Sequence, residues 1–89
     1  MTDRYDVAIK VISQNGYCAN GHKVGDEWII KDDVTTGGIC LEAFHALFPQ
    51  LWTLIFNGSF PWSDDLDTVQ VTCPDGKNPV TFELRRLKK

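Results

Sequence analysis

The sequence has no long hydrophobic run. Its longest apolar-rich stretch, residues 39–56, is interrupted by acidic, amide, histidine and proline residues, and the first ten residues contain no apolar segment. A membrane-spanning helix needs roughly 18 or more consecutive apolar residues, and a secretory signal needs an apolar h-region. We therefore expect a cytoplasmic protein with no membrane partner.

Basic residues are also few. The 89-residue chain has nine Lys and Arg against twelve Asp and Glu, giving a formal net charge of -3. Nucleic-acid-binding proteins usually carry a basic face, so we expect no nucleic-acid partner. The basic run 85–89 is short, and we interpret it as the solvated end of a strand.

Cysteine is scarce and odd in number. Three cysteines do not make a closed disulfide framework, and thiols stay reduced in the cytosol. Repeats and low-complexity segments are absent, and 43% hydrophobic with 24% charged residues is typical of a folded chain. The length predicts a single domain, 1–89.

Hydrophobic alternation predicts strands over 5–12, 27–31, 68–73 and 80–87, the last two forming an antiparallel hairpin. Apolar residues at helical spacing predict a helix over 39–48, capped by Thr35 or Thr36, with Pro49 interrupting it before a second segment, 51–55. Turn residues 13–16 end the first strand, and Asn57-Gly58 ends the helical region. These elements predict an α+β fold: a small antiparallel sheet of about four strands with one or two helices packed on one face.

Three cysteines and one histidine form the first candidate site: Cys18, His22, Cys40 and Cys73. Zinc accepts a Cys3His ligand set, and an iron–sulfur cluster is disfavoured because no two of the cysteines are close in sequence. Only Cys18 and His22 form a tight pair. Cysteines are also buried for packing reasons alone, and Cys73 continues the apolar face of its strand. Metal ligation and core packing both remain open.

A reactive cysteine is the third alternative. The predicted position of Cys40 near a helix start favours a thiolate, so Cys40 is a candidate nucleophile with His22 as its base. Asp26 is a candidate binding residue that either orients His22 or accepts a hydrogen bond from the loop backbone. The sequence has no phosphate-binding loop, dinucleotide fingerprint or paired catalytic carboxylate motif.

Aromatic residues supply the remaining candidates. Trp52 lies on the predicted apolar stripe, and we expect it in the core. Phe60 and Trp62 lie in a predicted loop beside Asp64, Asp65 and Asp67. An aromatic loop with an acidic rim is typical of a surface that binds a protein partner or a second copy of the chain. The alternative is that both rings cover a small core.

Five blocks of the sequence (18–26, 38–49, 60–62, 71–75 and 80–86) resemble a family of small uncharacterised bacterial and archaeal proteins, found largely in anaerobes. The resemblance covers nearly the whole chain. It implies that Cys18, His22, Cys40 and Cys73 belong to a family pattern, and it implies no particular reaction. One departure is that Ala19-Asn20 stands where a proline often follows the first cysteine.

Overall fold

The computed structural model describes residues 5–14, 23–31, 34–35, 37–73 and 79–87. Its elements follow the chain as β1 (Asp6–Gln14), β2 (Glu27–Lys31), β3 (Val34–Thr35), α1 (Leu41–Ile55), β4 (Thr68–Thr72) and β5 (Val80–Leu87). The predicted bounds of β2 and β5 are confirmed, and β4 ends one residue before its predicted end.

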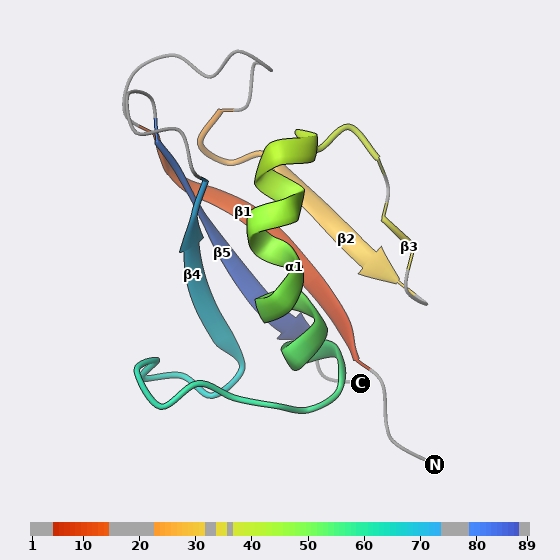
Figure 1. Ribbon diagram of the computed structural model, residues 1–89, viewed down its shortest axis with the longest axis vertical. Helices are drawn as coiled ribbons and strands as arrows, with labels where there is room; N and C mark the ends of the chain where they lie inside the picture. The colour runs from red at the N-terminus through yellow and green to blue at the C-terminus, as the bar shows by residue number, and fades with distance from the viewer. Residues whose placement is uncertain (1–4, 15–22, 32–33, 36, 74–78, 88–89) are drawn as a thin grey trace.

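The strands form one sheet in the order β3-β2-β1-β5-β4, and each neighbouring pair is antiparallel. Helix α1 packs against one face of this sheet (Figure 1). The predicted α+β fold is therefore confirmed, including the β4–β5 hairpin. The strand that sequence analysis did not predict is β3, which has two residues.

Strand β1 runs to Gln14, so the prediction of a turn beginning at Ser13 was wrong. Its register against β5 shifts between Val11 and Ser13, which leaves Ile12 as the extra residue of a bulge. The bulge explains the error, because the simple alternation of the strand breaks there while pairing with β5 continues.

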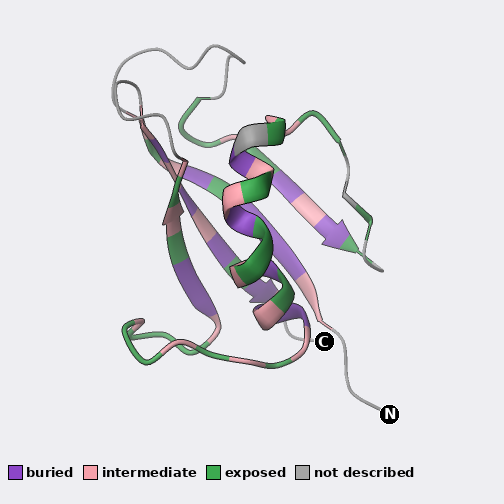
Figure 2. Ribbon diagram, viewed as in Figure 1, coloured by how far each residue is buried: buried purple, intermediate pink, exposed green. Residues whose placement is uncertain are grey.

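The core lies between α1 and the sheet. Alternation places one face of each long strand toward the helix, and α1 contributes a stripe at three- and four-residue spacing (Figure 2). The residues of this hydrophobic core from the sheet are Val7, Ile9, Val11, Trp28, Ile30, Val69, Val80, Phe82 and Leu84, and those from α1 are Ala43, Leu47, Leu51, Leu54 and Ile55.

Helix α1 begins later than predicted. Its N-cap is Cys40, whose side chain makes no capping hydrogen bond. Thr35 belongs to β3 and Thr36 lies outside the described residues, so the expectation that Thr35 caps the helix was wrong. The predicted stop at Asn57-Gly58 is confirmed: α1 ends at Ile55, and Asn57 takes a positive φ of 68°.

Pro49 lies inside α1, so the prediction that it interrupts the helix was wrong. Proline removes the hydrogen bond that its N–H would donate to the carbonyl of His45. Both residues are exposed, so that carbonyl lies on the solvent side of the helix, where water can replace the lost donor. The Oγ1 of Thr53 donates a hydrogen bond to the carbonyl of Pro49 at 2.9 Å.

In the described part of the chain, no helix has the length and apolar character needed to cross a membrane.

Candidate functional site

The structure describes two of the four residues in the predicted Cys3His site, Cys40 and Cys73. Cys18 and His22 lie outside the described residues. Cys40 is half-buried at the start of α1, where its carbonyl accepts the N–H of Phe44 at 2.8 Å. Cys73 follows β4, and its Sγ accepts the N–H of Val80 at 3.3 Å.

The start of α1, which Cys40 caps, and the end of β4, which Cys73 follows, lie toward the same end of the molecule (Figure 1). Both cysteines also pack against the hydrophobic core. Within the described ranges, no group of three or more His, Cys, Asp or Glu side chains is arranged to hold a metal ion. The zinc site and the pairing of Cys40 with His22 therefore stay predictions.

Asp26 has a local role in the turn before β2. Its Oδ2 accepts the backbone N–H of Lys23 at 2.9 Å, and its own N–H donates to the carbonyl of Lys23 at 3.0 Å. Its carbonyl accepts the N–H of Val11 in β1 at 2.9 Å. Asp26 thus accepts a hydrogen bond from the loop backbone, one of the two roles expected from the sequence.

A buried guanidinium organises the opposite end of the molecule. Arg86 of β5 is only 5% exposed, so its assignment to a solvated basic end was wrong. Its Nη1 donates to the carbonyls of Leu54 and Gly58, and its Nη2 donates to that of Leu66 at 2.8 Å. Its Nε pairs with Asp67 Oδ1 at 3.0 Å. One side chain therefore ties the end of α1 and the loop 56–67 to the sheet.

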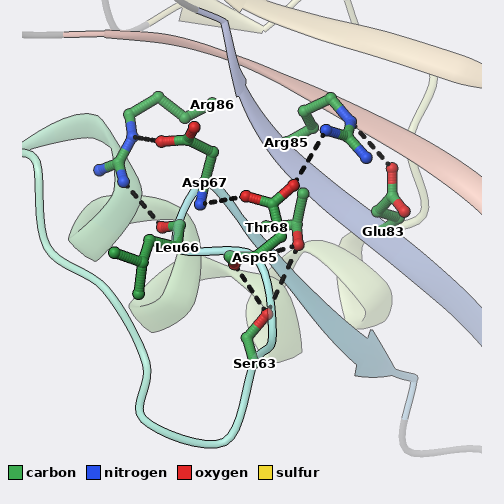
Figure 3. A network of polar contacts seen from close by, with 8 residues as sticks. All are labelled: Ser63, Asp65, Leu66, Asp67, Thr68, Glu83, Arg85 and Arg86. Atoms are coloured by element: carbon green, nitrogen blue, oxygen red, sulfur yellow. Dashed lines mark hydrogen bonds and ion pairs between the residues drawn. The ribbon is translucent and has the colours of Figure 1, made fainter.

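The same loop is held by a second set of polar contacts (Figure 3). Asp65 Oδ1 accepts the N–H of Asp67, and the carbonyl of Asp65 accepts the hydroxyl of Ser63, each at 2.9 Å. Arg85 lies between Asp65 Oδ2 and Glu83 Oε1, at 3.4 and 3.3 Å. The loop that carries the predicted aromatic residues thus has a defined conformation.

The two aromatic residues of this loop have different environments. Phe60 packs against the core, whereas Trp62 is 70% exposed. Their ring centroids are 5.0 Å apart, so the half-buried Phe60 ring contacts the exposed indole. The idea that both rings cover the core holds for Phe60 and is wrong for Trp62.

Trp62 forms one wall of a groove of about 370 Å³ on the sheet face opposite α1. The groove is lined by Trp62, Ser63, Asp64, Asp65, Thr68, Gln70 and Glu83. Within the described residues, Asp64 has no ion-pair partner, whereas Arg85 pairs with both Asp65 and Glu83. The groove therefore combines an exposed aromatic face with an excess of negative charge.

Trp52 contradicts the sequence prediction in another way. It is 44% exposed and not part of the core, because it lies one residue, about 100°, around α1 from buried Leu51. It stacks on Phe48 at 5.6 Å and meets Phe56 edge-on at 4.8 Å, and Phe48 in turn contacts Phe44. Phe48 and Trp52 are the exposed members of this aromatic row, whereas Phe44 and Phe56 also pack against the core.

Sequence analysis missed Arg86 although a signal was present. Arg86 has the same alternation as Val80, Phe82 and Leu84, which all face the core. A basic residue on the buried face of a strand requires acceptors, and the neighbouring loop supplies them.

Comparison with protein-family models, curated proteins and solved structures gives no match for this chain. The family resemblance is thus neither supported nor refuted.

Proposed function

We propose that this domain is a protein-interaction module that binds a lysine or arginine side chain of a partner protein in the Trp62 groove. The observation that carries the proposal is the 70% exposure of Trp62 beside the unpaired carboxylate of Asp64, on a loop held by Arg85 and Arg86. A cation over an indole face gains about 0.5–2 kcal/mol, and a nearby carboxylate adds to this attraction.

Preorganisation supports this function. An exposed indole leaves apolar area in water, and binding a partner recovers part of that free energy. The hydrogen bonds of Arg86 and Asp65 fix the loop before any ligand arrives, so binding does not have to order it. A groove of about 370 Å³ is at the small end of ligand-binding cavities, which suits one long side chain better than a whole cofactor.

The test is an NMR titration of the ¹⁵N-labelled protein with the peptide acetyl-Thr-Ser-Thr-Lys-Thr-Ser-Thr-amide. We expect saturable shifts of the Trp62 indole N–H and of the loop amides. Replacing the lysine with norleucine keeps the four side-chain carbons and removes the ammonium group, so this peptide should bind roughly 2- to 30-fold more weakly.

Two protein variants make the test specific. Trp62→Ala should lose binding, whereas Trp52→Ala, which removes another exposed indole on a different surface, should keep it. Asp64→Asn should weaken binding, and Glu27→Gln, which removes an exposed carboxylate from β2, should not. Equal binding of the lysine and norleucine peptides, or no effect of Trp62→Ala, would refute the proposal.

A Cys3His metal site is the second candidate function. Its support is that two of its four predicted ligands, Cys40 and Cys73, adjoin the start of α1 and the end of β4, which lie toward one end of the molecule. Metal analysis of tag-free protein purified without oxygen tests it. About one zinc per chain, lost in Cys40→Ser and in Cys73→Ser, would support the site, and three titratable thiols without metal would exclude it. From the scarce and odd cysteines we also infer a cytoplasmic location.

A further inference from the structure

The outer edge of β4 carries backbone groups that no other strand of the described residues uses. The N–H of Arg86 donates to the carbonyl of Asp67, and the N–H of Cys73 donates to the carbonyl of Val80. In an antiparallel ladder the residues that bond a given neighbour alternate, so Val69 and Val71 also face β5. Gln70 and Thr72 therefore direct their N–H and C=O groups away from β5, at the end of the strand order.

Thr68 is only partly available at this edge. Its N–H donates to the carbonyl of Asp65 at 3.1 Å, which leaves its carbonyl as the outward group. The accessible edge in the described part of the chain thus consists of the Thr68 carbonyl and both backbone groups of Gln70 and Thr72. The opposite edge of the sheet is a poorer template, because β3 has two residues and positive-φ glycines 37 and 38 follow soon after it.

This edge borders the Trp62 groove. Thr68 and Gln70 line the groove, and their side chains lie on the sheet face opposite α1 because Val69 and Val71 pack toward the core. A residue that pairs with Gln70 across a new ladder would place its side chain on the same face as that of Gln70. Its long side chain would then extend beside Trp62 and Asp64.

We propose that β4 binds an extended segment of the partner by antiparallel strand addition, with a basic residue opposite Gln70 and its side chain in the groove. This inference rests on the function proposed above. Charge favours a basic segment as the occupant over a second copy of the chain, because Thr68–Thr72 contains no basic residue to fill the acidic groove.

The test uses two N-methylated forms of the central-lysine peptide. Methylation of the backbone nitrogen of the lysine removes the N–H that faces β4 in an antiparallel pair. Methylation of the backbone nitrogen of the following threonine removes an N–H that points away from β4. We expect the first peptide to bind at least tenfold more weakly and the second to bind within about threefold of the parent. Hydrogen exchange of the Gln70 and Thr72 amides should slow at least tenfold when the parent peptide is bound.

The outcomes separate this inference from the proposed function. Equal binding of the two methylated peptides, with Trp62→Ala still abolishing binding, would overturn strand addition and leave the basic-side-chain site intact. If the parent peptide binds no more tightly than acetyl-lysine-amide, strand addition is likewise overturned and the basic-side-chain site is left intact. Loss of lysine dependence would refute both. Protection of Gln70 and Thr72 that rises with protein concentration, together with a doubled mass in sedimentation, would identify a second copy as the occupant and overturn the inference.

Discussion

Replacing Arg86 with alanine should destabilise the protein severely. The guanidinium is 5% exposed, donates to three carbonyls, pairs with Asp67 and lies 5.4 Å from the centroid of the Tyr5 ring. Removing one partner of a buried ion pair costs about 3–5 kcal/mol, because the remaining groups lose their partner without regaining full contact with water.

This loss is large for so small a protein. Typical stabilities of about 0.05–0.15 kcal/mol per residue give this chain roughly 4–13 kcal/mol in total. With a urea m-value of about 1.5–2 kcal/mol per molar, Arg86→Ala should lower the unfolding midpoint by roughly 2–3 M.

Urea unfolding followed by circular dichroism measures this effect. The matched control is the neighbouring Arg85→Ala, whose side chain is 48% exposed, and which should cost less than about 1 kcal/mol. If Arg86→Ala does not fold, Arg86→Lys should fold and still lose about 1–3 kcal/mol, because an ammonium cannot reach all of these acceptors. An Arg86→Lys or Arg86→Ala protein as stable as Arg85→Ala would refute the reasoning.

Four further substitutions test the description of α1 and of the turn that follows it, again by urea unfolding. Leu51→Ala should cost about 2–5 kcal/mol because it opens a core cavity. Trp52→Ala opens no core cavity and should cost less, about 1–2 kcal/mol, for its two surface ring contacts; equal costs would contradict the helix orientation. Pro49→Ala should stabilise the protein by about 1–2 kcal/mol by restoring a helical N–H, and a loss of stability would contradict a continuous helix. Gly58→Ala should cost about 1–3 kcal/mol, because its Cβ would lie 2.9 Å from the carbonyl oxygen of Thr53; a neutral effect would contradict that close approach.

The strands were predictable because their side chains alternate between two environments. Val80, Phe82 and Leu84 show this pattern clearly, and the bounds of β5 were correct. The pattern weakens where the backbone departs from regular pairing, so the bulge after Val11 led to a strand end placed too early. For β3, two residues are too few to show any periodicity.

The helix shows how an apolar stripe can mislead. Leu47, Leu51 and Leu54 face the sheet, but Phe48 and Trp52 have equally apolar side chains at helical spacing and face outward. Hydrophobicity alone does not distinguish the two sides of such a helix. The position of the sheet decides which side is buried, and that is a tertiary property.

The candidate groove was predictable in part. Phe60, Trp62 and their acidic neighbours were recognisable as an aromatic loop with an acidic rim. Which ring is buried depends on the path of the loop, and that path depends on Arg86, which is far along the chain. In a strand, the alternation of side chains indicates which of them face the core, but a loop has no such periodicity.

The place of β5 in the sheet has a consequence for synthesis on the ribosome. Strand β5 is the last strand in chain order, yet it lies between β1 and β4 and also carries Arg86. While residues 80–87 are still inside the exit tunnel, β4 has no neighbour and the loop 56–67 lacks its buried donor. Strands β1, β2 and β3 can pair with one another earlier, but β4 joins the sheet only after β5 has been released.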